Sequence, residues 1–211
     1  MSEIVLLGSG GHAKVVLDII RKMSKYKILG VVTKQKIKNF EGIKVLGDDG
    51  ILNELYKSGI RCLAMGIGGF RDNETRKTVF LKSKKLGFNF ISAIDTSAII
   101  SNSVVLGEGV VLFPGVLLNT DVRIGDNVII ATGSSIDHET IIRNHALVSA
   151  GVTIGANCVI DDEALVALGA NIVSGIHICE KALVGAGATV VKDIEEKGLY
   201  LGCPAKKKMQ S

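Results

Sequence analysis

The segment Ser135-Ile-Asp-His-Glu places a histidine between two carboxylates, because His138 follows Asp137 and precedes Glu139. A neutral imidazole can accept a proton from an amine or hydroxyl nucleophile at physiological pH. A neighbouring carboxylate makes the imidazole more basic and stabilises its protonated form. His138 with Glu139 is therefore a candidate general base. The other interpretation is an ordinary solvated histidine beside two acids.

A second candidate site is the glycine-rich segment near the start of the chain. Gly8, Gly10 and Ala13 satisfy the pattern G-x-G-x-x-G/A between an apolar strand-like run and a helical pattern. Such a turn lets backbone N–H groups at a helix start approach a phosphate. A dinucleotide site needs an acidic residue about 20 residues later, where this chain has Thr33 and Lys34. We therefore favour a phosphorylated or nucleotide-linked small molecule over a dinucleotide or a purely structural turn.

The other histidines carry weaker signals. His12 lies inside the glycine-rich turn, where it either projects over a ligand or is a solvated polar residue at the helix start. His145 and His177 are interpreted as ordinary polar residues. The histidines, cysteines and carboxylates show no metal-ligand spacing, so we predict no catalytic metal.

The element that must position His138 is a six-residue repeat. From Ile100 to Val190 every sixth residue is aliphatic, and the residue two positions earlier is mostly small. This period fits neither an α-helix nor a flat strand, but it fits a chain that turns after every short strand and coils into a β-solenoid. If three repeats form one triangular coil, residues eighteen apart stack. His138 then lies between Thr120 and Ala156.

The corners of this solenoid are predicted three residues after each aliphatic position, where Gly, Asn or Asp predominates. These residue types tolerate left-handed backbone. Glu139 and His145 occupy consecutive corners and break the rule, and such local exceptions often mark function. Leu168 is an apolar residue in an outward-leaning, mostly polar column. It suits contact with an apolar ligand arm or a neighbouring subunit.

The first ninety residues follow a different pattern. Short apolar strands alternate with helical segments, which predicts a small parallel α/β sheet about half the size of a dinucleotide-binding domain. The six-residue period begins near residues 92–96. The predicted strands are 4–7, 28–33, 61–67 and 88–91, and the predicted helices end near Met23 and run from about Arg71 to Leu86.

The composition excludes several classes of protein. The net charge is only +4, and the lysines are scattered without interleaved aromatic residues, so nucleic-acid binding is not expected. No apolar run reaches the length of a membrane span, and the start lacks the basic region of a signal peptide. The four cysteines show no CxxC spacing and are interpreted as reduced thiols of a cytoplasmic protein.

With these features together, the chain resembles the NeuD/PglD group of sugar acyltransferases, which are hexapeptide-repeat enzymes that use acetyl-CoA. The resemblance covers almost the whole chain. It rests on four segments: Ile4-Val-Leu-Leu-Gly-Ser-Gly-Gly-His-Ala-Lys-Val-Val, Ser135-Ile-Asp-His-Glu, Gly185-Ala-Gly-Ala-Thr-Val-Val-Lys-Asp-Ile, and Glu196-Lys-Gly-Leu-Tyr-Leu-Gly-Cys-Pro-Ala-Lys.

The resemblance implies a half-Rossmann-like α/β domain over residues 1–93 that binds the acceptor sugar. It implies a left-handed parallel β-helix over residues 94–211 that binds acetyl-CoA and assembles as a homotrimer. It makes His138 the general base and Glu139 the carboxylate that raises its basicity, and it predicts that the backbone N–H of Ala156 polarises the thioester carbonyl. The predicted acceptor-binding residues are Gly10, Gly11, His12, Thr33 and Lys34. The predicted coenzyme-binding residues are Leu147, Ala156, Leu168 and Ala186.

The chain departs from the bacillosamine-pathway members at two places. Leu147 stands where those members have a second histidine, so its contact with the coenzyme must be absent or replaced. Thr33-Lys34 replaces an acidic pair that receives a uracil ring. The lysine would suit an anionic group better, such as another nucleotide's phosphate or a sugar-acid carboxylate.

The sequence therefore predicts N-acetylation of a nucleotide-activated amino sugar in surface glycan biosynthesis, by direct attack on acetyl-CoA. The alternative within enzymes is O-acetylation of a sialic-acid-type sugar. A non-catalytic solenoid module would need neither the His138-Glu139 pair nor the α/β domain. An NAD-linked oxidoreductase is opposed by the missing acid that would hold the ribose.

Overall fold

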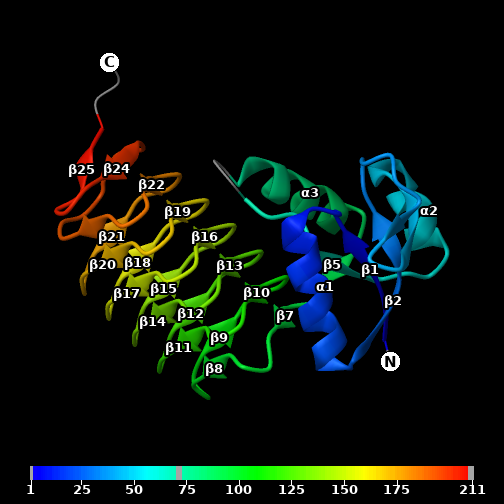
Figure 1. Cartoon of the computed structure of the whole chain (residues 1–211), viewed down its shortest axis with the longest axis horizontal. Coiled ribbons are helices and arrows are strands. Elements are labelled where there is room, and N and C mark those ends of the chain that lie inside the picture. The colour runs from blue at the N-terminus through cyan, green and yellow to red at the C-terminus, as the bar shows by residue number, and fades with distance from the viewer. Residues whose placement is uncertain (1, 70–72, 209–211) are drawn as a thin grey trace.

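The computed structural model describes residues 2–69 and 73–208, which form an α/β region beside a long parallel β-helix (Figure 1). The coils of the β-helix are stacked from β8 and β9 at one end to β24 and β25 at the other. The α/β region lies against one side of this stack (Figure 1). The predicted fold class is confirmed.

The α/β region is built on one mixed sheet with the strand order β3-β4-β2-β1-β5-β6. All pairs are parallel except the β3–β4 hairpin. The strands are β1 (Ser2–Leu7), β2 (Tyr26–Val32), β3 (Asn39–Phe40), β4 (Ile43–Gly47), β5 (Cys62–Met65) and β6 (Asn89–Phe90). The helices are α1 (Gly11–Met23), the 3-10 turn η1 (Asp49–Ile51), α2 (Leu52–Lys57) and α3 (Glu74–Lys85).

The four predicted strands and two predicted helices are present, with shifted ends. The third strand stops at Met65 rather than at residue 67, and α3 begins at Glu74; the predicted start at Arg71 lies outside the described residues. Sequence analysis missed β3, β4, η1 and α2. These elements are short, and their apolar residues are too few to show a clear period.

The β-helix has three sheets, and residues eighteen apart stack on successive coils, as predicted. Sheet 1 contains β7 (Ala93–Ile94), β10 (Val111–Leu112), β13 (Ile129–Ile130), β16 (Leu147–Val148), β19 (Leu165–Val166), β22 (Leu183–Val184), β24 (Leu199–Leu201) and β25 (Lys206–Lys207). Sheet 2 contains β8 (Ile99–Ile100), β11 (Leu117–Leu118), β14 (Ser135–Ile136), β17 (Thr153–Ile154), β20 (Asn171–Ile172) and β23 (Thr189–Val190). Sheet 3 contains β9 (Val105–Leu106), β12 (Arg123–Ile124), β15 (Ile141–Ile142), β18 (Val159–Ile160) and β21 (His177–Ile178).

The six-residue repeat gives the β-helix its core. The repeated aliphatic residues and the small residues two positions earlier point inward and form one continuous buried cluster. Each fully buried Val, Leu or Ile contributes roughly 1.5–3 kcal/mol. The backbone has a positive φ at nearly all predicted corners, including Glu139, His145, Glu163 and Lys181. A positive φ is costly for these residue types, so each needs a compensating contact or a function.

The two regions share a hydrophobic interface. The outward residues of sheet 1, including Ile129, Leu147 and Leu165, pack in one buried cluster with Val16, Ile20 and other residues of α1. Sheet 1 is therefore covered by the α/β region, while the corner between sheets 2 and 3 is not part of this contact.

The corner between sheets 3 and 1 receives α3. The buried Arg76 guanidinium donates hydrogen bonds to the backbone carbonyls of Asn127, His145 and Ala146. Lys77 forms a 2.5 Å ion pair with the corner residue Glu163. Helix α3 is thus joined to the β-helix by buried and partly buried polar contacts.

Candidate active site

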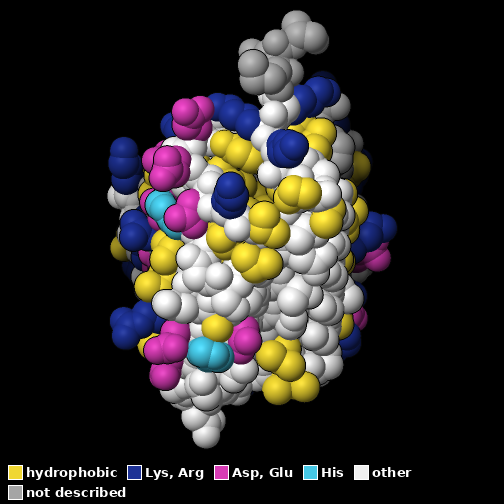
Figure 2. Space-filling view, turned by 90° about the vertical axis from the view of Figure 1, so that its left-hand side faces the viewer, with side chains coloured by type: hydrophobic (Ala, Val, Ile, Leu, Met, Phe, Trp, Pro, Cys, Tyr) yellow, Lys and Arg dark blue, Asp and Glu magenta, His cyan; other side chains and the backbone are white. Residues whose placement is uncertain are grey.

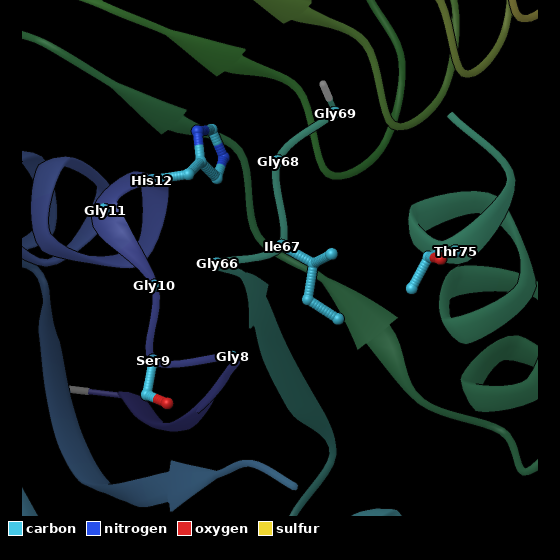
Figure 3. A pocket seen from close by; sticks show the side chains of 10 residues that line it. All are labelled: Gly8, Ser9, Gly10, Gly11, His12, Gly66, Ile67, Gly68, Gly69 and Thr75. Atoms are coloured by element: carbon cyan, nitrogen blue, oxygen red, sulfur yellow. The ribbon is translucent and has the colours of Figure 1, made fainter. Parts of the chain in front are cut away.

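The glycine-rich turn and the loop after β5 enclose a hollow of about 560 Å³. Residues 8–12 line one side, residues 66–69 line the other, and Thr75 of α3 closes the end (Figure 3). The hollow lies at the carboxyl ends of the adjacent parallel strands β1 and β5, which is where ligands bind in open parallel sheets.

The glycines of this turn have different roles. Gly8 has a φ of +97° and needs the conformational freedom of glycine, and a Cβ at Gly66 would lie 2.6 Å from the Leu7 carbonyl oxygen. By contrast, a Cβ at Gly10 or Gly11 would meet no atom within 4 Å. Gly10 also caps α1 without a side-chain hydrogen bond, so the first N–H groups of the helix face the hollow uncovered. This end of the hollow suits an anionic group such as a diphosphate.

His12 lines the same hollow, with its ring between the start of α1 and Gly68 (Figure 3). The ring stacks on Phe113 of the β-helix, with ring centroids 5.4 Å apart. Burial, and next the charge of Arg76, lower the pKa of His12 to about 4. The imidazole is therefore neutral at physiological pH. Its Nε2 is buried and forms no hydrogen bond among the described residues.

Thr33 and Lys34 line a second hollow of about 200 Å³ that adjoins the first one at Gly8, Ile67 and Thr75. The Thr33 hydroxyl is hydrogen-bonded to the Ser9 hydroxyl at 2.7 Å. The structure thus brings all five predicted acceptor-binding residues to one continuous groove.

His138 and Glu139 lie on the exposed corner between sheets 2 and 3. His138 Nδ1 is 3.1 Å from Oε2 of Glu139, and the two side chains are 48% and 63% exposed. When Nδ1–H donates to this carboxylate, Nε2 carries the lone pair and can accept a proton. Figure 2 shows two histidines beside acidic side chains on the face turned away from the α/β region; His138 and His177 are the chain's two exposed histidines.

Asp137 fixes the backbone of this corner. Its Oδ1 accepts from the His138 backbone N–H and from Asn119 Nδ2, both at 2.8 Å. These hydrogen bonds, the first one above all, lower the pKa of Asp137. Asp137 therefore stays ionised and orients the segment, while Glu139 contacts the imidazole.

The predicted coenzyme-binding residues lie in three places. Ala156 is one coil above His138, and its backbone N–H donates to Ser174 Oγ at 3.1 Å, so this hydroxyl must turn away before the N–H can meet a thioester carbonyl. Leu168, which is 60% exposed, and Ala186 stack on the corner between sheets 1 and 2. Leu147 is only 7% exposed and packs beneath the α/β region.

Within one chain, the groove and His138 are on different sides of the β-helix. His12 stacks on Phe113, which directly follows β10 of sheet 1, whereas His138 follows β14 of sheet 2. Sheet 2 lies between Phe113 and the corner with the histidine. One chain therefore does not bring the predicted base to the predicted acceptor site.

Sequence analysis missed several residues that line the groove. Asp49 of η1 and Thr75 of α3 line it, and Lys34 Nζ is 3.2 Å from Asp49 Oδ2. The loop glycines Gly66, Gly68 and Gly69 were a usable signal, since they follow a buried strand. Asp49 had no such signal in the sequence, because η1 was not predicted.

Among residues 2–69 and 73–208, no cluster of His, Cys, Asp and Glu has metal-binding geometry, and no helix is long and apolar enough to cross a membrane.

An α/β region joined to a hexapeptide-repeat β-helix with an exposed His–Glu pair is the architecture of a class of acyltransferases. Residues 3–83 match the PglD N-terminal domain, and residues 97–138 match the bacterial transferase hexapeptide repeats. The chain belongs to the PglD-like family of acetyl-CoA-dependent sugar N-acetyltransferases.

Three relatives illustrate the family. The GDP-perosamine N-acetyltransferase of Caulobacter crescentus, solved with CoA and GDP-perosamine, is 33% identical, with a TM-score of 0.94 over 100% of this chain and 98% of that one. The acetyltransferase domain of PglB from Neisseria gonorrhoeae, solved with acetyl coenzyme A, is 25% identical, with a TM-score of 0.91 over 98% of both chains. UDP-N-acetylbacillosamine N-acetyltransferase of Bacillus subtilis is 33% identical over 120 residues, which span 53% of this chain and about half (51%) of that protein.

Proposed function

We propose that the chain transfers the acetyl group of acetyl-CoA to the amino group of a nucleotide-linked amino sugar. The α/β region, residues 1–93, binds the acceptor, and the β-helix, residues 94–211, binds acetyl-CoA. The single observation that carries this proposal is the exposed His138 imidazole, whose Nδ1 faces Glu139 and whose Nε2 is open. The relatives support the substrates, since one was solved with CoA and GDP-perosamine and another with acetyl coenzyme A.

The reaction is a direct attack. The acceptor amine forms a bond to the acetyl carbon while His138 Nε2 takes its proton, and the carbon–sulfur bond then breaks. The proton passes to the departing CoA thiolate. Glu139 stabilises the imidazolium, and a backbone N–H such as that of Ala156 stabilises the developing oxyanion. No acetyl-enzyme is needed. Cys158 is buried and burial raises its pKa, which disfavours the thiolate.

The active site is shared between copies of the chain in a homotrimer. In each chain the groove lies between α1 and α3 on the side of sheet 1, and His138 is on the corner of sheets 2 and 3. Apposing these two surfaces from two neighbours brings the base to the acceptor, and the exposed Leu168 and Ala186 then face the coenzyme. The four cysteines are unpaired thiols, which suits a reaction in the cytoplasm.

The direct test is an acetyl-transfer assay with UDP-, GDP- and CMP-linked amino sugars, and with free sialic acids for O-acetylation. We expect an N-acetylated nucleotide sugar. His138→Ala should reduce kcat by about 10³-fold, because general-base catalysis contributes on that scale, while acetyl-CoA binding stays unchanged. Wild-type turnover in His138→Ala would refute the assignment. Activity of mixed trimers of His138→Ala and Gly10→Trp chains above that of either variant alone would support the shared site.

A further inference from the structure

The groove continues beyond the glycine-rich turn to an ion pair that no motif predicted. Its second hollow is lined by Val32, Thr33 and Lys34 at the end of β2, by Asp49 of η1 and by Val79 of α3. It shares Gly8, Ile67 and Thr75 with the first hollow, so one ligand can occupy both.

The order of groups along this groove matches the parts of a nucleotide. The open turn at Gly10 and Gly11, at the N-terminus of α1, suits the diphosphate. The Ser9 and Thr33 hydroxyls, 2.7 Å apart, come next. Lys34 and Asp49 are at the far end, beside the apolar side chains of Val32 and Val79, which can pack on a flat ring.

The ion pair favours a neutral polar ligand over a second anion. Lys34 Nζ lies 3.2 Å from Asp49 Oδ2, on side chains that are 78% and 40% exposed, so an anion bound to Lys34 would lie beside the Asp49 carboxylate and be repelled by it. The sequence-based expectation that Lys34 receives a phosphate or carboxylate stays a prediction, and the neighbouring Asp49 favours a different ligand group. The Asp49 carboxylate offers two hydrogen-bond acceptors, and the Lys34 ammonium offers a donor beside them. This pattern complements the edge of a base that has two donors beside one acceptor.

We propose, building on the proposed function, that Asp49 and Lys34 read the base of the acceptor and select guanine. The two Asp49 oxygens accept from guanine N1–H and the exocyclic amino group, and Lys34 donates to the guanine carbonyl oxygen. Uracil presents one N–H flanked by two carbonyl oxygens, so one of its carbonyls would face the carboxylate. The acceptor is therefore a GDP-linked amino sugar.

The test is titration calorimetry of the full-length protein with GDP, IDP, UDP and 2′-deoxy-GDP. IDP keeps the guanine carbonyl and N1–H but lacks the amino group. We expect GDP to bind at least about 10-fold more tightly than UDP and IDP, and 2′-deoxy-GDP to bind like GDP, because a charge-assisted hydrogen bond is worth about that factor or more. Asp49→Asn should weaken GDP binding until GDP binds no more tightly than IDP. Lys34→Met should weaken the binding of GDP and of IDP by the same factor.

Glu54→Gln is the matched control, since Glu54 is an exposed acid of α2 outside the groove, and it should leave all four affinities unchanged. UDP binding as tight as GDP would overturn the inference but leave the proposed function intact. If Asp49→Asn weakened the binding of GDP, IDP and UDP equally, and 2′-deoxy-GDP bound weakly to wild type, Asp49 would contact the ribose. That result would also overturn the inference. Binding of acetyl-CoA but of no nucleotide would refute the nucleotide-linked acceptor as well.

Discussion

Two corners of the β-helix carry residues other than glycine, asparagine or aspartate: Glu139, which follows His138, at one corner, and His145 and Glu163, on successive coils, at the other. At the corner between sheets 2 and 3, His138 and Glu139 are about half or more exposed and contact each other. At the corner between sheets 3 and 1, His145 and Glu163 are each 6% exposed and are covered by α3. The same irregularity in the sequence therefore has two different causes.

At the buried corner, the unusual residues serve packing between α3 and the β-helix. The His145 ring meets the Phe80 ring edge-on at 5.5 Å, and its Nδ1 is 2.9 Å from Asn127 Nδ2. Burial, and next the charges of Arg76 and Lys77, lower the pKa of His145. Its imidazole is thus neutral and enclosed, whereas His138 has an open nitrogen and a single carboxylate partner. The difference teaches that an unusual residue at a corner of the β-helix is a catalytic candidate only where no other element packs on that corner.

The largest expected effect is a reversal between alanine substitutions at the two histidines. His138→Ala should lose about 10³-fold in kcat without a change in melting temperature. His145→Ala should lower the melting temperature by several degrees while kcat per folded molecule stays within about twofold of wild type. Acetyl-CoA turnover and thermal denaturation at fixed protein concentration measure both. A large kcat loss in His145→Ala with an intact fold would contradict the comparison.

Arg76 tests how strongly α3 is joined to the buried corner. Burial lowers the pKa of Arg76 to about 9, and its guanidinium still donates to the His145 and Ala146 carbonyls. Arg76→Met leaves these acceptors unpaired, so the free energy of unfolding should fall by about 3 kcal/mol. The control is Arg123→Met on the exposed face of sheet 3, which should change it by less than about 0.5 kcal/mol. Equal effects in denaturant titrations would show that the contact is not stabilising.

Acid should destabilise the interface between the two regions, because its histidines are held neutral. The folded pKa of His12 is about 4, below the value near 6.5 of an unfolded histidine. As the pH falls below about 6.5, the unfolded chain binds a proton that the folded chain excludes, so stability is lost down to about pH 4. The full loss from His12 is about 3 kcal/mol, and His145 acts in the same direction.

Denaturant titrations of wild type and His12→Asn at pH 7 and pH 4.5 measure this effect. The variant should lose clearly less stability than wild type between the two pH values. Parallel losses in both proteins would mean that His12 is not held neutral in the folded state.

The smallest expected effect is a difference in unfolding free energy between glycine substitutions at the two corners. Glu139 has a φ of +58° and His145 a φ of +61°. Glycine relieves the backbone cost at both, so Glu139→Gly should raise the unfolding free energy by up to about 1 kcal/mol while lowering activity. His145→Gly loses more in packing than it gains, and its unfolding free energy should fall. A stability loss in Glu139→Gly would show that the exposed His–Glu pair also supports the fold.

The sequence indicated most of the fold because its signals are local and repeated. The aliphatic positions from Ile100 to Val190 predicted the coils, the core and the stacking of His138 below Ala156. It located the groove that we propose for the acceptor through Gly8, Gly10 and His12, since a turn between a strand and a helix has a recognisable composition. The short segments of residues 34–60 lacked such a period, and with them Asp49 was missed.

The sequence by itself determined the class of fold, the residues at each corner and the chemical types available for catalysis, because periodicity and turn chemistry act over a few residues. Only the tertiary structure decided which corner α3 covers, that Leu147 lies beneath the α/β region, and that Lys34 pairs with Asp49. These facts depend on contacts between elements far apart in the chain, and such contacts leave no periodic trace in either partner. They separate a histidine that packs, His145, from one that is free to act, His138.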